Sequence, residues 1–232
     1  MRVSAIIAAL NEAGAIGDVV SACLRDGGVD EVVVVDDGSR DDTARIAEAA
    51  GARVLQHAHN RGKGAALRRA AAEASGECLV TLDGDGQDDP RDLPALVRAI
   101  EEGAELVIGS RFRGHLRPGA ITPLHRLGNL GLTAAFNLMY GMRLSDTQAG
   151  LRAIRRELWQ RLPLSATRYE IETEVLVRAI QAGATVVEVP VTRSPRVHGR
   201  SALHGLRDGR RIFGCMVRLR AEAFARARRG DP

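Results

Sequence analysis

Cysteine, aromatic residues and lysine are all scarce in this sequence of 232 residues. The three cysteines are far apart and include no C-x-x-C pair, which argues against a zinc site and favours reduced thiols. Aromatic residues make up 3% of the chain, so there are few rings on which the bases of a single-stranded nucleic acid could stack. We therefore expect no nucleic-acid partner.

The sequence also lacks a long apolar run. The longest candidate, residues 127–140, has about 14 residues, which is too few to cross a bilayer as a helix. The first residues, MRVSAIIAALNE, lack the length and the cleavage site of a signal peptide. We therefore expect a folded cytoplasmic protein without a membrane span.

Charge is distributed unevenly along the chain. The formal net charge is +4, yet residues 193–232 carry eleven arginines against three acidic residues, and the rest is slightly acidic. This asymmetry favours an anionic partner, here a membrane surface. We predict a basic amphipathic helix over residues 204–232, peripheral at the inner face of the cell membrane; a packing helix with a solvated arginine face is the open alternative. Its apolar stripe comprises Ile212, Phe213, Met216, Val217 and Phe224.

Short apolar runs rich in β-branched residues alternate with helix-like segments as far as Gly109. This alternation predicts an α/β fold, with a mostly parallel central sheet and helices on both faces. We assign residues 1–110 to a nucleotide-binding half and residues 111–203, where the alternation stops, to an acceptor half. The two halves are expected to form a single domain, 1–203.

Polar clusters follow three of the predicted strands, at the point where each strand ends. They are Asn11 with Glu12, Asp36 with Asp37, and Asp83 with Asp85. Ligands of open α/β sheets bind beyond the carboxyl ends of the strands. The clusters are therefore expected to converge on one crevice.

Two common nucleotide sites do not fit this crevice. A dinucleotide-binding turn needs a G-x-G-x-x-G frame, and Glu12 stands where its first glycine belongs. The segment NRGKGAAL, which holds Lys63, the only lysine of the chain, lacks the frame of a P-loop. Two interpretations of this segment stay open, a loop that enters a helix or a phosphate contact.

The carboxylates of the stretch TLDGDGQDDP predict a metal site. Asp83 and Asp85 form a D-x-D pair at a strand end, and Mg²⁺ or Mn²⁺ prefers such oxygen ligands together with substrate phosphates. A bound cation would also relieve the repulsion between the two acids. Asp88 and Asp89, just before Pro90, are assigned instead to the first turn of a helix. Asp37 is placed to accept from a base N–H, or else belongs to turn chemistry.

Eight short motifs occur in an order that resembles the family 2 glycosyltransferases of GT-A fold, which have a Rossmann-like sheet. They are ALNE, VVDDGSRDDT, NRGKGAAL, LDGDGQDDP, GSRF, SDTQAGLRA, EIETE and EVPVTRSPRVHGRS, and they extend from about residue 3 to residue 203. Within the family, the chain is most similar to synthases that attach a sugar to dolichyl or polyprenyl phosphate.

The resemblance implies a role for each matching residue. The nucleotide-sugar donor would contact Ala8, Leu10, Glu12, Val35, Asp37, Asp83, Gly84, Asp85 and Gln87. The metal ion would be held by Asp85 and Gln87, and the acceptor phosphate by Arg111, Arg126, Arg196 and Arg200. The catalytic set would be Asp83, Asp85, Arg111 and Arg196. Two positions depart from the family pattern: Ala8 replaces a usual proline, and Ala202 replaces a phosphate-directed lysine, whose charge Arg200 or Arg193 would have to supply.

These residues predict an inverting, divalent-metal-dependent glycosyltransferase. It would move a sugar from GDP-mannose or a UDP-hexose to a polyprenyl or dolichyl phosphate, whose oxygen is already ionised and needs no general base. Glu170, Glu172 and Glu174 would then be acids of a first helical turn, although one could serve as the base for a hydroxyl acceptor. A transferase with a hydroxyl acceptor, and a non-catalytic nucleotide-binding module at a membrane, are the alternatives.

Overall fold

The computed structural model describes residues 1–196, 198 and 205–229. A seven-stranded sheet forms the centre of the molecule, in the order β3-β2-β1-β4-β6-β5-β7. Only β6 runs against its neighbours, so the prediction of a mostly parallel sheet is confirmed. The strands are β1 (Val3–Ala9), β2 (Glu31–Asp36), β3 (Arg53–Gln56), β4 (Cys78–Asp83), β5 (Leu106–Leu116), β6 (Arg152–Arg155) and β7 (Val186–Arg193).

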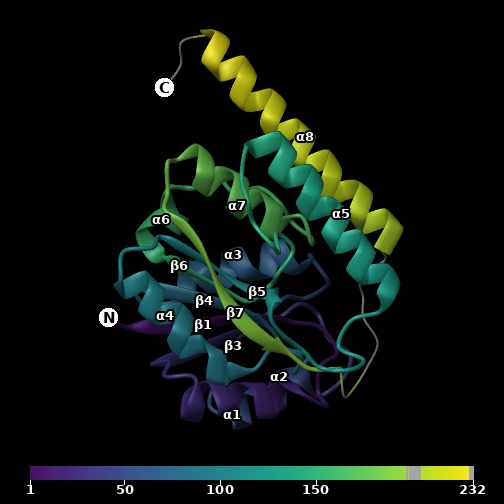
Figure 1. The fold of residues 1–232 in the computed structure, drawn as a ribbon. Helices are drawn as coiled ribbons and strands as arrows, with labels where there is room; N and C mark the ends of the chain where they lie inside the picture. The colour runs from purple at the N-terminus through teal and green to yellow at the C-terminus, as the bar shows by residue number, and fades with distance from the viewer. Residues whose placement is uncertain (197, 199–204, 230–232) are drawn as a thin grey trace.

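Helices cover both faces of the sheet (Figure 1). They are α1 (Ile16–Asp26), α2 (Thr43–Ala49), α3 (Lys63–Glu73), the 3₁₀ turn η1 (Pro90–Asp92), α4 (Leu93–Glu101), α5 (Pro123–Tyr140), α6 (Arg156–Arg161), α7 (Ile171–Gln181) and α8 (Gly205–Arg229). One core lies between the sheet and α1 and α4, and the other lies under α3, α6 and α7. Because successive strand residues face opposite sides, Ile6 belongs to one core and Ile7 to the other.

Long helices α5 and α8 lie side by side over α7, at the top of Figure 1. Helix α5 begins at the capping residue Thr122, whose hydroxyl accepts from His125 N, and ends at the left-handed Gly141. The basic C-terminal segment is a helix, as predicted, but its apolar stripe is divided. Ile212 and Met216 are buried in the core, whereas Phe213 is 46% exposed.

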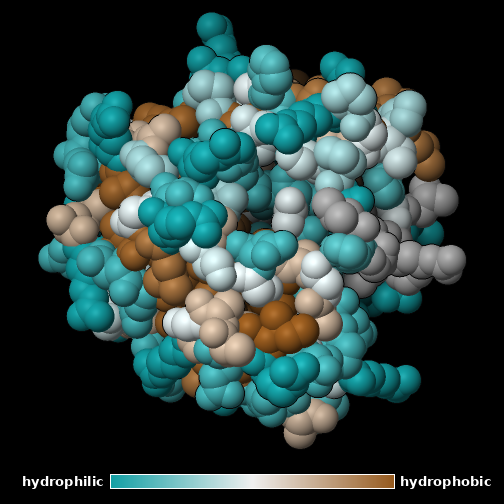
Figure 2. Space-filling model, turned by 90° about the horizontal axis from the view of Figure 1, so that it is seen from below, coloured by the Kyte–Doolittle hydropathy of each residue, from teal (hydrophilic) through white to brown (hydrophobic). Residues whose placement is uncertain are grey.

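The opposite side of the molecule, seen from below in Figure 2, has hydrophilic side chains around most of its rim and smaller hydrophobic areas between them. On α5 and α8, by contrast, large apolar side chains are exposed at helical spacing. They are Leu124, Leu127, Leu130 and Leu138 on α5 and Phe213, Val217 and Phe224 on α8. Within the described residues, none of the helices has both the length and the hydropathy of a membrane-spanning helix.

Candidate functional site

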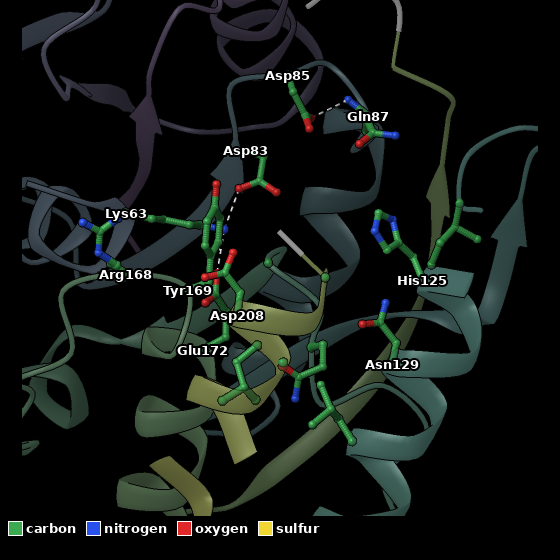
Figure 3. Close-up of a pocket in the computed structure, with 18 of the residues that line it drawn as sticks. Lys63, Asp83, Asp85, Gln87, His125, Asn129, Arg168, Tyr169, Glu172 and Asp208 are labelled. Carbon is green, nitrogen blue, oxygen red and sulfur yellow. Dashed lines mark hydrogen bonds and ion pairs between the residues drawn. The ribbon is translucent and has the colours of Figure 1, made fainter. Parts of the chain in front are cut away.

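The carboxyl ends of β1, β2 and β4 lie level with one another. In the sheet register Ala8 is opposite Asp83, and Ala9 is opposite Asp36. A cavity of about 1110 Å³ opens at this point and continues between α5 and the start of α8. Figure 3 shows its carboxylates on one side and α5, with His125 and Asn129, on the other.

Most of the predicted site residues line this cavity. They are Ala8, Leu10, Glu12, Asp37, Asp83, Gly84, Asp85, Gln87, Arg111 and Arg196. Two predicted residues lie elsewhere. Val35 is wholly buried in the apolar core, and Arg126 is exposed on α5, outside the lining of the cavity. Arg200 and Ala202 are outside the described residues.

The two D-x-D carboxylates have different cationic partners. Asp83 Oδ1 is 2.6 Å from Lys63 Nζ, and Asp85 Oδ2 is 2.7 Å from Arg196 Nη2. Arg193 lies between them, with its Nη2 3.9 Å from Asp83 Oδ2 and 3.8 Å from Asp85 Oδ2. Arg193 entered the sequence analysis only as a replacement for the missing lysine, yet it lies at the centre of the acidic pair.

The pKa values of the two acids shift in opposite directions, because their charged neighbours differ. Burial raises the pKa of Asp85, and the negative charge of Asp83 raises it further. Burial also acts to raise the pKa of Asp83, but Lys63 and then Arg193 outweigh it and lower this pKa to about 2. The surroundings of Asp83 therefore favour its ionised form, whereas those of Asp85 disfavour ionisation.

The turn after β4 places Gln87 where both its backbone and its side chain form hydrogen bonds. The backbone N–H of Gln87 donates to Asp85 Oδ1 across Gly86, which has a positive φ of 71°. The side-chain amide of Gln87 donates to the carbonyls of Ala120 and Ser194, and its oxygen accepts from Arg193. Gln87 thus ties the turn to two loops, which differs from the predicted role of a metal ligand.

The assignment of Asp88 and Asp89 to a first helical turn holds for only one of them. Asp89 caps η1, since its side chain accepts from Arg91 N. Asp88 is buried and is paired with Arg193 Nη1 at 2.5 Å. Because Asp88 and Arg193 are more than a hundred residues apart in the chain, no local sequence pattern could indicate that they pair.

Asp37 lines the cavity, but its carboxylate already has three partners. Oδ1 is 2.6 Å from His57 Nδ1 and accepts from Arg61 N, and Oδ2 accepts from Gly62 N. These bonds hold the loop that leads into α3. A base N–H would therefore meet a carboxylate whose orientation is fixed by the protein.

Arg111 is held by a residue that sequence analysis did not identify. Its Nε and Nη2 form a two-pronged pair with Asp146 Oδ2 and Oδ1, at 2.7 and 2.8 Å. Asp146 is fully buried, and its own N–H donates to the Glu188 carboxylate. The motif SDTQAGLRA was the only sequence signal for Asp146, and it gave no partner.

Two acidic residues of α7, Glu172 and Glu174, lie in different surroundings. Glu172 lines the cavity, and its Oε1 is 2.6 Å from Lys63 Nζ. Glu174 is wholly buried and accepts from the backbone N–H groups of Ser165 and Ala166. Both lie in the first turn of α7, as predicted.

The D-x-D pair fits a divalent cation that is shared with a substrate. In the described part of the chain, no cluster of three histidine, cysteine or acidic residues could enclose an ion by itself. Mg²⁺ and Mn²⁺ are commonly held by one or two carboxylates together with substrate phosphates and water. The raised pKa of Asp85 beside Asp83 is the property that a bound cation would relieve.

The fold and this site define a nucleotide-sugar-dependent glycosyltransferase of GT-A type. The chain belongs to glycosyl transferase family 2, whose family model matches residues 4–162. The predicted fold class and enzyme class are thereby confirmed.

Named relatives extend this similarity to nearly the whole chain. Glycosyltransferase AglJ of Haloferax volcanii is 37% identical, over 96% of this chain and 71% of that protein. The UDP-N-acetylglucosamine–dolichyl-phosphate N-acetylglucosaminyltransferase of Methanococcus voltae is 31% identical, over 80% of this chain and 83% of that protein.

Among solved structures, glucosyl-3-phosphoglycerate synthase from Mycobacterium tuberculosis is similar, with a TM-score of 0.75 and 30% identity over 95% of this chain and 80% of that chain. A structure of the same enzyme contains Mn²⁺ and uridine diphosphate. Divalent-metal and nucleotide binding therefore occur in a close structural neighbour of this chain.

Proposed function

We propose that this protein transfers a hexose from a nucleotide sugar to a polyprenyl or dolichyl phosphate, with a divalent cation held at Asp83 and Asp85. The observation that carries this proposal is the composition of the large cavity at the carboxyl ends of the strands. The D-x-D pair, Arg193 and Arg196 line its end at the sheet, while its continuation between α5 and α8 combines apolar and small residues with the polar His125, Asn129, Asp208 and Arg210. An acceptor with a phosphate at one end and an apolar chain behind it could place its phosphate near the arginines and its chain between α5 and α8.

The donor would lie at the ends of β1, β2 and β4. Glu12 and Asp37 face the part of the cavity assigned to the nucleoside, and Asp83 and Asp85 face the part assigned to the diphosphate. When bound, the cation supplies positive charge to the departing nucleoside diphosphate. Arg193 and Arg196 lie beside the same carboxylates, so their guanidinium groups are placed to take over the phosphate oxygens.

The acceptor would be oriented by Arg111. Its pairing with the buried Asp146 fixes the plane of the guanidinium, which favours a single approach for a phosphate. A lipid phosphate is already ionised near neutral pH, so attack on the anomeric carbon requires no general base. In-line attack opposite the leaving diphosphate would invert the anomeric centre.

The exposed faces of α5 and α8 support a peripheral membrane location. Leu124 and Leu138 on α5 are 76% and 88% exposed, and Phe224 on α8 is 61% exposed. Exposed arginines alternate with these apolar residues along α8. Such a surface binds anionic leaflets through both burial of apolar area and charge. The cavity mouth between the two helices would then open toward the bilayer and, with it, toward the lipid acceptor.

A hydroxyl acceptor is the second candidate, and one observation favours it. Glu172 lines the cavity and is held in place by Lys63, so a carboxylate that could accept a proton is present. The similarity to the synthase of glucosyl-3-phosphoglycerate supports the same possibility.

One assay separates the two candidates. The protein is incubated with Mn²⁺, a panel of radiolabelled UDP- and GDP-sugars, and one of three acceptors: undecaprenyl phosphate, undecaprenol, or phosphoglyceric acid as a soluble hydroxyl acceptor. The proposal predicts label in the organic phase with the phosphate only. Label confined to the aqueous phase with a soluble acceptor would favour the hydroxyl alternative, and no transfer to any acceptor would contradict both.

A further inference from the structure

The only lysine of the chain lines the cavity, on the side of its carboxylates (Figure 3). Lys63 is the first residue of α3, and its side chain is 14% exposed. Its Nζ is 2.6 Å from Asp83 Oδ1 at the end of β4 and 2.6 Å from Glu172 Oε1 on α7. The lysine thus connects a carboxylate at a strand end with a carboxylate on a helix.

The backbone that carries Lys63 is firmly held. Gly62 has a φ of 95°, and a side chain there would collide with the carbonyl of Thr167. The N–H of Gly62 donates to Asp37, and the N–H of Ala65 donates to Thr167 O. The backbone position of Lys63 is therefore fixed, and its ammonium group reaches Asp83 and Glu172 from that fixed position.

The two carboxylate oxygens of Asp83 face different partners. Oδ1 is taken by Lys63, whereas Oδ2 turns toward Arg193 Nη2, at 3.9 Å. The same nitrogen is 3.8 Å from Asp85 Oδ2. One oxygen of each aspartate therefore faces the same nitrogen of Arg193, so the side of Asp83 that is turned away from Lys63 is the side turned toward the charges around Asp85.

The Glu172 side of the bridge is also anchored. Its backbone carbonyl accepts from the buried Arg152 Nη1, so the position of the residue is fixed while its side chain depends on Lys63. Without the ammonium, two carboxylates that each lie within hydrogen-bond distance of one nitrogen would repel each other. Asp83 would then be free to rotate away from its present orientation.

We infer that Lys63 is a positioning residue for the metal site: it orients Asp83 so that one oxygen faces Asp85, and it holds Glu172 against the same cavity. This inference rests on the proposed metal-bound diphosphate site. Lys63 acts through the carboxylates and is not assigned a contact with the substrate.

The test measures Mn²⁺ binding directly. Electron paramagnetic resonance of free Mn²⁺ gives its affinity in the presence of UDP and, separately, GDP, with no acceptor and no turnover. Lys63→Met is expected to weaken Mn²⁺ binding about tenfold or more, as loss of a group that orients a metal ligand commonly does. Lys63→Arg keeps the charge and is expected to bind Mn²⁺ more tightly than Lys63→Met.

The matched control is Arg69→Met on the same helix, whose side chain donates to the carbonyl of Gln56 far from the D-x-D pair. It should bind Mn²⁺ like the wild type. A Lys63→Met protein with an unchanged circular dichroism spectrum and wild-type Mn²⁺ affinity would overturn the inference. If the wild type itself fails to bind Mn²⁺ with either nucleotide, the proposed function is what fails.

Discussion

Arg196 and Asp85 form an ion pair in which Nη2 of the arginine is 2.7 Å from Oδ2 of the aspartate. The other nitrogen of the same guanidinium is 2.9 Å from Glu12 Oε1. Arg196 is thus paired with the Asp85 oxygen that the proposed cation requires. It also contacts Glu12, at the part of the cavity assigned to the nucleoside. Binding of metal and donor must therefore release this arginine, and the released guanidinium is then free to bind phosphate.

Removing this competitor should separate metal binding from catalysis. Arg196→Ala is expected to bind Mn²⁺ several-fold more tightly without nucleotide, because Asp85 loses its cationic partner. Turnover should fall by about 100-fold, since one donor to the developing charge is lost. Mn²⁺ titration and initial rates measure the two effects.

Arg126→Ala is the control for Arg196→Ala, because Arg126 is exposed on α5 and outside the cavity lining. Its rate should stay within about twofold of wild type, as for most surface substitutions. A large loss at Arg126 with little effect at Arg196 would reverse the assignment made here.

The buried Asp146 should affect use of the acceptor as strongly as Arg111, the arginine that it orients. Asp146→Asn removes the charge that fixes Arg111 and is expected to lower kcat/KM for the acceptor about tenfold to 100-fold. Its KM for the donor should change little. Arg113→Ala, at an exposed position 3.8 Å from Glu188, provides the comparison. Equal losses for donor and acceptor in Asp146→Asn would argue for a general structural role.

The two D-x-D acids should affect stability in opposite ways. Asp85 has a raised pKa when folded, so its ionisation destabilises the fold as pH rises above the ordinary value of 3.8. Asp83 has a pKa lowered to about 2, so its ionisation stabilises the fold above 3.8, and that contribution is lost as pH falls toward 2. In metal-free buffer at pH 7, Asp85→Asn should melt above the wild type and Asp83→Asn below it.

Thermal melts over a range of pH check the cause of this difference. The gain in Asp85→Asn should shrink as the pH is lowered toward 4, because folded wild-type Asp85 becomes protonated on the way, whereas the loss in Asp83→Asn should persist at pH 4 and shrink only below 3.8. Shifts of the same sign at pH 7 would contradict the electrostatic description of the pair.

Membrane binding should depend on the exposed face of α8. The double variant Phe213→Ser, Val217→Ser is expected to bind vesicles of phosphatidylglycerol and phosphatidylcholine about tenfold or more weakly in a flotation assay. The reason is that two large apolar side chains are lost from the binding surface. Leu24→Ser removes a comparably exposed apolar residue from α1, on the other side of the sheet, and should leave flotation unchanged. Equal binding by both variants would remove this role from α8.

Sequence analysis predicted the parts of the molecule whose signals are local. The apolar run before Asp83 predicted a strand, and the carboxyl-end rule then placed Asp83 and Asp85 in a crevice with Glu12. The strand register confirms this, since Ala8 pairs with Asp83. The helical character of residues 205–229 was equally visible from its pattern of charge and apolar residues.

The partners of these residues were not predictable in the same way. Lys63 meets Glu172 across more than a hundred residues of chain, and Arg193 meets Asp88 across a similar separation. Val35 was placed against the base only because the family resemblance implies that role, yet it is wholly buried in the apolar core. Such contacts depend on the tertiary fold, so a motif can indicate that a residue matters without showing what it binds.

Transfer of a labelled hexose to undecaprenyl phosphate, followed as a function of Mn²⁺ in the wild type and in Asp85→Asn, tests the central claim most directly. The account predicts an organic-soluble product that requires Mn²⁺ in the wild type, is abolished by a chelator, and falls by about 1,000-fold in Asp85→Asn. Near-normal transfer by Asp85→Asn, or by the wild type after complete removal of divalent metal, would contradict it.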